Sequence, residues 1–531
     1  MKPNLNTFEL LNLINLLTKE KNTTKFLEII LDTAMKITNS DAGSIYKVID
    51  NKQLRFEIIK TKSLNIHCGG TSNEPLFFDE IPLYDKSNPV LTKVVTYCYH
   101  TQKTINIQNV DEDHDGIFID TKYADKKIGY KTIALLTVPI CNHENEIVSI
   151  LQLINPLDST SKIINYDVND EKIVESLCSL AASALTQKQL IQRLEQLFES
   201  FIKLINKAID DKSPYTGKHC SRVPILTELI ALSLHESDHN PFSQFTLSEK
   251  DKYELKIASL LHDCGKISTP IHVVDKATKL ECILDRIELI SLRFEIIKKD
   301  LELQLLKNEI NQTQYQHSIE DIKQSYQFLK DINFGSESMN NEDILRLNSI
   351  AKRYALEIDG KIISAISQDE LYNLEIKRGT LNDSDRHIIN RHIDTTIEML
   401  EALPWPKHLK NVPEYAGGHH EKMDGSGYPR GLHKNELSIQ ARCLAIADIF
   451  EALTAKDRPY KKGKTLSESL TILGKMKLNN HIDPDIFNVF IWDKVYERYA
   501  EQFLDPEQID QVNLYEIPGY ESPPINQTIN N

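Results

Sequence analysis

The sequence lacks several features that would place it in a specialised class of protein. Its 18 glycines and 20 prolines among 531 residues are too few for a fibrous or low-complexity chain. No apolar run approaches the ~18 residues of a transmembrane helix, and the N-terminus, MKPNLNTFELLN, lacks the basic region and apolar core of a secretory signal. Eight scattered cysteines without a CxxC pair argue against a disulfide framework or a zinc ribbon. We therefore expect a cytoplasmic protein that does not cross a membrane.

The chain also lacks an excess of basic residues. Its formal net charge is −15, so we do not expect it to bind DNA non-specifically. An anionic small substrate is compatible with this charge only if a metal ion or a local basic patch holds it. At ~150 residues per domain, the length predicts ~3 to 4 domains.

Residues 1–184 are predicted to form a mixed α/β domain. Helical patterns at Phe8–Leu17 and Thr24–Ile37 precede strand-like runs separated by polar stretches. These runs are Ser44–Ile49, Arg55–Thr61, Thr104–Ile107, Ile133–Ile140 and Ile147–Ile154. The pattern resembles a GAF sensory domain, whose closing strand would be Ile147–Pro156.

The exit of the closing strand bears on the ligand of this GAF-like domain. GAF domains that bind cyclic nucleotides carry an Asn-Lys-Phe type signature near the exit of the closing strand, whereas here Pro156 follows Asn155. The resemblance therefore argues against a cyclic nucleotide, and a dimerising or degenerate sensor is an equal alternative.

Residues 185–210 are predicted to form a helical linker. Apolar residues recur at spacings of 4, 3, 4, 3 and 4, namely Leu190, Leu194, Leu197, Phe201, Leu204 and Ala208. This is the a/d pattern of a coiled coil, and it favours a parallel homodimer over a helix packed within its own chain.

Residues 211–500 are predicted to be all-helical. Within them, 281–372 contains two amphipathic stretches, starting at Ile287 and Tyr315, that predict a helical hairpin. The final segment, 501–531, is polar and contains four prolines, which predicts a poorly ordered tail.

Residues of metal-ligand type interrupt the apolar stripes of four predicted helices. They are His219, His262, His392 and Asp448. One buried histidine is usually an ordinary core residue, but a buried carboxylate needs a partner, and four such positions favour a shared metal site. Asp263 directly follows His262, and the pair His419-His420 adds two imidazoles. Six or seven ligands exceed one tetrahedral ion and indicate two metals.

Four motifs in this region resemble a known family. The central one, LLHDCGKI (Leu260–Ile267), is similar to the core of HD-domain phosphohydrolases. The stretch HHEKMDGSGYPRGL (His419–Leu432) resembles the one that defines the HD-GYP subfamily. The segments Ser213–Val223 and Ile446–Lys462 resemble its entry helix and its closing helix. Members of this subfamily hydrolyse cyclic di-GMP, and some cleave 3′,3′-cyclic GMP-AMP.

The resemblance implies roles for individual residues. The implied metal ligands are His219, His262, Asp263, His392, His419, His420 and Asp448. Asp263 would bridge two divalent ions, with Fe or Mn expected, and Lys266 would contact the scissile phosphate. Arg458 and Lys461 would hold the substrate. Tyr428 and Pro429 lie on a loop that would contact either the substrate or a protein partner such as a diguanylate cyclase.

The sequence departs from the family pattern in two places that matter. Some members have a glutamate four residues before the first histidine that supplies a third metal, but here that residue is Tyr215, so two metals are expected. The family also joins the HD motif to the next metal-binding helix by a short stretch, whereas here Ile271–Leu280 and Arg378–His392 flank the long insertion 281–372.

The expected function is hydrolysis of cyclic di-GMP to linear pGpG, regulated by the GAF-like domain, with a further cut to GMP left open. One alternative is a 3′,3′-cGAMP phosphodiesterase. Others are an HD phosphohydrolase acting on dNTPs or (p)ppGpp, and a catalytically silent receptor or scaffold for cyclic di-GMP or a diguanylate cyclase.

Overall fold

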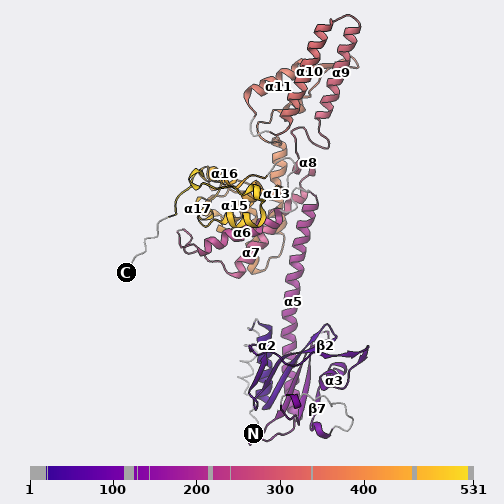
Figure 1. Ribbon diagram of the computed structural model, residues 1–531, viewed down its shortest axis with the longest axis vertical. Coiled ribbons are helices and arrows are strands. Elements are labelled where there is room, and N and C mark those ends of the chain that lie inside the picture. Colours follow the sequence, from indigo (N-terminus) through magenta and orange to yellow (C-terminus); the bar gives the residue numbers. More distant parts are fainter. Residues whose placement is uncertain are drawn as a thin grey trace, which may run out of the picture. The chain divides into compact units, whose positions relative to one another are not determined.

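A computed structural model describes residues 20, 22–112, 125–127, 129–142, 144–212, 219–239, 241–335, 339–456 and 463–523. The chain divides into two compact units, Met1–Phe198 and Glu199–Asn531 (Figure 1). In these described ranges, no helix is both long and apolar enough to cross a membrane.

The first unit is built on an antiparallel sheet with the strand order β3-β2-β1-β9-β8-β7, and β4 also pairs with β2. The strands are β1 (Ser40–Ile49), β2 (Gln53–Thr61), β3 (Ile66–Gly69), β4 (Ile81–Pro82), β7 (Ile105–Ile107), β8 (Leu135–Cys141) and β9 (Ile147–Pro156). A small β5–β6 hairpin (Tyr84–Asp85, Asn88–Pro89), the helices α2 (Thr23–Thr38) and α3 (Val94–Thr101), and the short helix η1 (Val110–Glu112) complete it. The predicted mixed α/β domain is confirmed, whereas the predicted helix Phe8–Leu17 lies outside the described residues.

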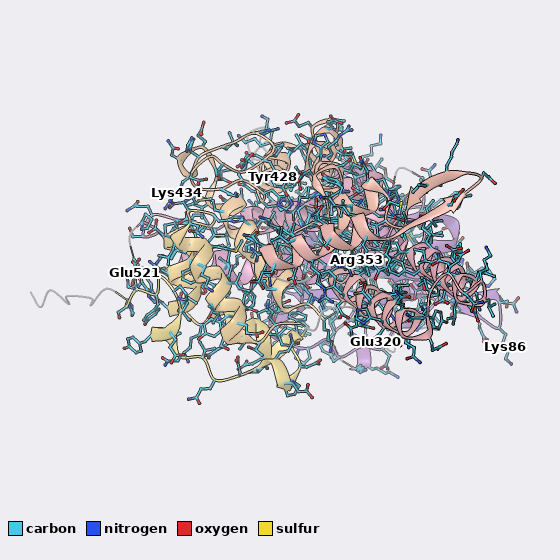
Figure 2. The ribbon with its side chains drawn as sticks, turned by 90° about the horizontal axis from the view of Figure 1, so that it is seen from above. Lys86, Glu320, Arg353, Tyr428, Lys434 and Glu521 are labelled. Atoms are coloured by element: carbon cyan, nitrogen blue, oxygen red, sulfur yellow. The ribbon has the colours of Figure 1, made fainter. Side chains whose placement is uncertain are left out.

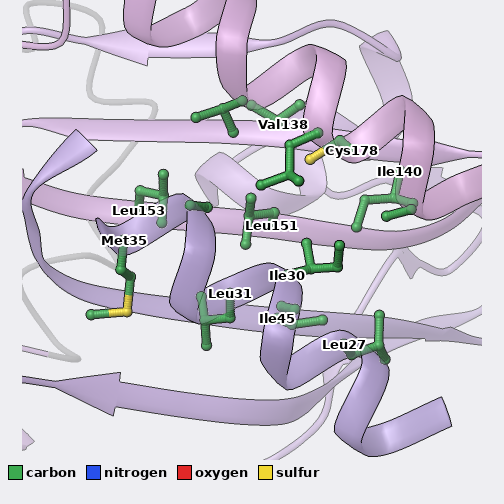
Figure 3. Packing of buried hydrophobic residues seen from close by; sticks show 14 of the residues in the cluster. Leu27, Ile30, Leu31, Met35, Ile45, Val138, Ile140, Leu151, Leu153 and Cys178 are labelled. Atoms are coloured by element: carbon green, nitrogen blue, oxygen red, sulfur yellow. The ribbon is translucent and has the colours of Figure 1, made fainter. Parts of the chain in front are cut away.

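The core of this unit lies between the sheet and two helices (Figure 3). Leu27, Ile30 and Leu31 of α2 meet Leu151 and Leu153 of β9 in one buried cluster. Alternate residues of a strand point to opposite faces of the sheet. Ile150 accordingly belongs to a second buried cluster, which includes side chains of α3.

The helix α5 (Val168–Lys212) is 45 residues long. Its early residues, such as Leu177 and Cys178, belong to the core of the first unit. The predicted linker 185–210 is therefore the later part of a longer helix. Along that part the apolar seam is exposed, from 50% at Leu190 to 66% at Leu194, while Ile202 and Ile209 on another face are buried.

The second unit is mainly helical, and several of its helices contribute residues to the predicted site. They are α6 (His219–Glu236), α7 (Glu249–Leu261), η2 (Cys264–Ser268), α8 (Ile271–Val274), α13 (Asp383–Glu401), η3 (Lys407–Leu409), α14 (Val412–Gly417), η4 (Lys434–Glu436), α15 (Ile439–Thr454), α16 (Leu466–Leu478), α17 (Pro484–Trp492) and α18 (Val495–Phe503). Pro224 lies inside α6 without ending it.

The insertion has its own architecture. It contains α9 (Ile287–Leu306), α10 (Gln312–Asn333), α11 (Asn341–Arg353), β10 (Ala355–Ile358), β11 (Lys361–Ser364) and α12 (Gln368–Leu374). The predicted hairpin is α9 with α10, which lie side by side (Figure 1). The β10–β11 hairpin was not predicted. A separate buried cluster, with Ile290, Phe294, Ile322 and Leu347 among its members, holds the insertion together.

The predicted polar tail, 501–531, is described as far as Pro523, and that part packs against the helices. It includes the short helices η5 (Pro506–Gln508) and η6 (Leu514–Glu516). Gln508 Nε2 donates to the Thr454 carbonyl at 2.8 Å, and Ile517 is buried. These contacts differ from the predicted loose tail.

Candidate metal centre

The second unit gathers all seven predicted ligands from five parts of the chain. His219 is the first residue of α6, and Asp448 lies on α15. His262 caps the end of α7 and Asp263 precedes η2. The remaining three are His392 on α13 and the pair His419-His420, which follows α14.

Two histidines face two carboxylates on one side of the cluster. His219 Nε2 lies 3.1 Å from Asp448 Oδ1 and 3.5 Å from Asp263 Oδ2. His262 Nε2 lies 3.6 Å and 3.4 Å from the same two oxygens. All four side chains have little exposure, so this side of the cluster holds charge away from bulk water.

Three more histidines form a second group, and one of them, His392, faces the other oxygen of Asp263. His392 Nε2 lies 3.2 Å from Asp263 Oδ1 and 3.2 Å from His420 Nε2. The rings of His419 and His420 have centroids 4.1 Å apart. Ligand atoms of this group lie within 4.8 Å of one another, as do those of His219, His262 and Asp263. Asp263 therefore stands between two groups of potential ligands.

The hydrogen bonds made by Nδ1 direct Nε2 lone pairs into the cluster. The Nδ1 atoms contact backbone carbonyls three residues earlier, for His262 at Ser259 (2.8 Å), for His392 at Ile389 (2.5 Å) and for His419 at Ala416 (2.6 Å). A carbonyl only accepts, so each Nδ1 carries a proton, and Nε2 is the ring nitrogen left available to a metal ion.

Several of the atoms that face into the cluster have no hydrogen-bond partner within the described part of the chain. His262 Nε2, His419 Nε2 and Asp263 Oδ1 are buried and have no hydrogen-bond partner there. Buried polar atoms are nearly always paired. Lone pairs that face one another and a carboxylate call for a cation between them, so the residues fit divalent metal ions.

The pKa values of two histidines suit this role. Burial, together with the neighbouring His262, lowers the pKa of His419 to about 4. Burial and His419 hold the pKa of His420 well below its usual range. Both imidazoles are therefore neutral near pH 7, as a metal ligand must be.

Asp263 and His262, in contrast, favour their charged forms. Burial alone would raise the pKa of Asp263, but Lys266 and the histidines outweigh it and hold that pKa well below its usual range. Burial would likewise lower the pKa of His262, but Asp263 and Asp448 raise it to about 9. The cluster thus attracts positive charge, which protons supply in the metal-free protein.

Lys266 and Gly265 show why the HD motif has its sequence. The Lys266 ammonium pairs with Asp263 Oδ2. Gly265 lies against α13, where its N–H donates to Thr396 Oγ1 at 2.9 Å. A Cβ atom at position 265 would lie 2.0 Å from the His392 carbonyl oxygen, so only glycine allows this approach. Lys212, the last residue of α5, donates to the Lys266 carbonyl at 3.2 Å.

The loop with the Gly-Tyr-Pro sequence folds onto the site. Tyr428, which is labelled in Figure 2, stacks on His420, with ring centroids 4.8 Å apart and planes 18° apart. Glu421 accepts hydrogen bonds from the N–H groups of Arg430 (2.7 Å) and Leu432 (3.0 Å), which anchors the loop after Pro429.

Other predicted residues lie outside the described ranges. They are Arg458, Lys461 and Tyr215. Their proposed roles stay predictions.

Sequence reasoning missed two residues beside the ligands. Glu451 accepts hydrogen bonds from His219 Nδ1 and, at 2.6 Å, from Arg222 Nε. Glu451 is three residues after Asp448 on α15, and Arg222 is three after His219 on α6. Residues at this spacing share a helix face, so the spacing places both beside the ligands, but it does not show that they contact each other.

Comparison with known families follows the same division of the chain. A family model described as a GAF domain matches residues 22–185, and one described as an HD domain matches residues 363–486. The chain contains a GAF domain and an HD domain. The matched part of the HD domain includes His392, His419, His420 and Asp448.

Curated relatives extend this comparison. The chain is 24% identical over 289 residues to the 3′3′-cGAMP-specific phosphodiesterase 3 of Vibrio cholerae, covering 54% of this chain and 37% of that protein. It is 37% identical over 115 residues to the 3′3′-cGAMP-specific phosphodiesterase 1 of the same organism, covering 22% and 26%. It is 36% identical over 115 residues to a cyclic di-GMP phosphodiesterase of Pseudomonas aeruginosa, covering 22% and 27%. The chain spans less than two fifths of the length of these relatives. These matches confirm the resemblance seen in the sequence motifs.

Proposed function

We propose that the chain is a metal-dependent phosphodiesterase of cyclic dinucleotides. The observation that carries this proposal is that His262 Nε2, His419 Nε2 and Asp263 Oδ1 are buried and have no hydrogen-bond partner among the described residues. The names of the relatives, which are phosphodiesterases of 3′3′-cGAMP and cyclic di-GMP, support the substrate class.

Two divalent metal ions would occupy the centre, with Fe or Mn expected from the imidazole and carboxylate donors. His219 and His262 would help to hold one ion, and His392, His419 and His420 would help to hold the other. Asp263 would bridge the two ions. When bound, such ions lower the pKa of water and stabilise the charge that develops on a phosphoryl group.

The chain's own residues would bind and orient the substrate. Lys266 is partly buried beside Asp263, where its ammonium can contact a non-bridging phosphate oxygen. Tyr428, stacked on His420, offers an aromatic face next to the site. Attack of one water on phosphorus, with departure of the 3′ oxygen, would open cyclic di-GMP to linear 5′-pGpG.

A second substrate has specific support. Of the three relatives described above, the alignment that covers most of this chain is to a 3′3′-cGAMP-specific enzyme. Cyclic di-GMP remains the main proposal, and 3′,3′-cGAMP is the alternative.

The test is turnover by the purified full chain loaded with Mn or Fe(II), followed by chromatography of the products. We expect metal-dependent formation of linear pGpG or its cGAMP counterpart, and loss of it in Lys266→Met. Tight binding of either dinucleotide without turnover would support the receptor or scaffold reading instead. Hydrolysis of dNTPs or (p)ppGpp alone would contradict the proposed substrate class.

Regulation by the GAF domain is also part of the proposal. The exposed α5 seam supports a homodimer, and the hydrogen bond from Lys212 to the Lys266 carbonyl supports communication between α5 and the site. The Tyr428 loop would be the surface for a diguanylate cyclase partner, and the proposed location is the cytoplasm.

A further inference from the structure

We propose that Glu451, held by Arg222, is a positioning residue that sets the tautomer of His219 and so completes one of the two metal sites. This inference rests on the proposed function, because it concerns a ligand of the proposed metals. Nothing in the family matches or in the names of the relatives assigns a role to either residue.

His219 differs from three other histidines of the cluster in what its Nδ1 contacts. His262, His392 and His419 each use the backbone carbonyl three residues earlier. His219 instead contacts a carboxylate, Glu451 Oε2, from a helix 232 residues away in the sequence. A carboxylate fixes the Nδ1–H tautomer as a carbonyl does, and its negative charge also strengthens the donor power of Nε2.

Glu451 is itself held in place. Its side chain is 1% exposed, and its second oxygen accepts a hydrogen bond from Arg222 Nε at 2.6 Å. Arg222 lies on α6 three residues after His219, so both partners of Glu451 come from one face of one helix. The three side chains therefore form a hydrogen-bonded series, in which Arg222 orients Glu451 and Glu451 orients His219.

The consequence for the metal site follows from the geometry. With Nδ1–H donated to Glu451, Nε2 of His219 faces Asp448 Oδ1, 3.1 Å away, and is the ring nitrogen available to a metal ion. Without Glu451, the imidazole could carry its proton on Nε2 and donate it to Asp448 or Asp263. One ligand would then be lost and a carboxylate would be occupied by a hydrogen bond. Loss of such a supporting carboxylate typically lowers metal affinity by about 10- to 100-fold.

The experiment measures metal affinity rather than turnover. The full chain is stripped with a chelator and titrated with Mn in competition with a chromophoric chelator. We expect Glu451→Ala to weaken one of two sites by about 10- to 100-fold. Glu451→Gln should weaken it less, because its amide oxygen still accepts from Nδ1–H. Arg222→Gln should have a smaller effect in the same direction. The matched control is Glu398→Gln on the exposed side of α13, which should leave affinity unchanged.

A double-mutant comparison separates positioning from a general loss of structure. In the His219→Ala background, Glu451→Ala should cause no further loss of Mn affinity, because there is no imidazole left to orient. Equal losses of affinity in both backgrounds would overturn the proposal, as would unchanged affinity in a folded Glu451→Gln or Glu451→Ala protein. If Glu451→Ala does not fold, the comparison is made with Glu451→Gln.

The outcomes distinguish this inference from the proposed function. A wild-type protein that binds Mn but cleaves no cyclic dinucleotide would contradict the proposed function while the affinity series still tests Glu451. A wild-type protein that cleaves the substrate, with Mn affinity insensitive to position 451, would contradict only the positioning role.

Discussion

Asp263 contacts more of the site than any other single residue described above. Its Oδ2 faces His219 and His262, and its Oδ1 faces His392. Lys266 pairs with the same carboxylate. Removal of this one side chain therefore affects both groups of ligands.

We predict that Asp263→Ala abolishes hydrolysis while the protein stays helical. A metal centre supplies several kcal/mol of transition-state stabilisation, so turnover should fall by about 10³-fold or more. Turnover and circular dichroism would be measured on the same preparation. The matched control is Asp394→Ala on the exposed side of α13, which should keep activity. Wild-type turnover in Asp263→Ala would contradict the proposed mechanism.

Lys279 is a buried lysine outside the site. Its ammonium donates to the Leu374 carbonyl at 3.0 Å and lies 3.6 Å from Met339 Sδ. Burial lowers its pKa from 10.5 to about 8. Below pH 8 Lys279 is therefore charged in both the folded and the unfolded state. Burial makes that charge less favourable in the folded insertion than in the unfolded chain.

We predict that Lys279→Met stabilises the insertion at neutral pH by about 2 kcal/mol, from the lowered pKa less the lost hydrogen bond. Between about pH 8 and 10.5 the unfolded state binds more protons than the folded state, so the stability of the wild type should rise with pH. At the upper end of that window it should approach the stability of the variant. Hydrogen exchange of α9 and α10 amides at both ends of the window would measure this. Lys323→Met, at an exposed position of α10, is the control. A difference that does not change with pH would contradict the assignment.

Single residues also show how far sequence reasoning reached. The ligands could be predicted because each interrupts an apolar stripe or belongs to a motif. Glu451 and Arg222 could not, because their partner is set by the packing of α15 on α6. Local spacing shows that two residues share a face, but not what that face contacts.

At the scale of elements, α5 has an apolar face that no other described part of the chain covers. Leu194 and Leu197 are 66% and 55% exposed, and each falls on the heptad seam. Exposed apolar seams of this length are typical of helices that pair with a partner.

We predict that Leu194→Glu with Leu197→Glu shifts the protein from dimer to monomer, because buried charges at a and d positions oppose helix pairing. The measurement is sedimentation equilibrium. Gln192→Glu with Gln196→Glu, which lie off the seam, should leave the dimer intact. If the leucine variant is as dimeric as wild type, the interface lies in another segment.

There are physical reasons why some elements could not be predicted from the sequence. β11 is exposed at every position and β10 has one buried residue, so no alternating pattern marks them. The start of α5 at Val168 was missed because its first residues pack in the first unit and read as part of that domain. The later part, whose seam repeats regularly, was predicted within a few residues.

At the scale of the whole molecule, the metal centre links helices α6, α7, α13 and α15 and the residues after α14. Ions that bind only the folded state raise its stability by mass action. Asp263 belongs to one group of potential ligands and lies 3.2 Å from His392 of the other, so the expected content is two ions per chain.

We predict that elemental analysis of the purified protein approaches two transition-metal ions per chain. Saturation at about 100 times the dissociation constant should stabilise the second unit by about 2.7 kcal/mol per site. Thermal unfolding with and without a chelator would measure this. In Asp263→Ala the chelator should have much less effect. Three fully occupied sites would show that the expectation based on Tyr215 is wrong.

The insertion is closed at its base by contacts that do not involve the ligands. Leu280 N–H donates to Asn333 Oδ1 at 2.9 Å, and Leu280 and Leu374 belong to the insertion's own cluster. On the other side of the junction, Thr380 Oγ1 donates to the Lys276 carbonyl at 2.9 Å. The structure therefore places the natural boundaries at about 278 and 374, slightly outside 281–372.

We predict that replacing 278–374 with a short Gly-Ser linker leaves metal content and basal phosphodiesterase activity intact, while regulation or oligomeric state changes. The Lys276 ion pair with Asp385 should persist and hold the joined ends together. Metal analysis, turnover and sedimentation of the deletion protein would test this. Loss of metal from a soluble, helical protein would make the insertion part of the site, and no change in any property would make it neutral.

A segment that enters and leaves at one point, with its own core, can be exchanged as a unit. In genetic terms, a single in-frame insertion at this junction could add it, and a single in-frame deletion could remove it, without any compensating change among the residues around Asp263. The same junction is therefore the position at which a foreign domain, such as a fluorescent reporter or a ligand-binding module, could be spliced into this protein.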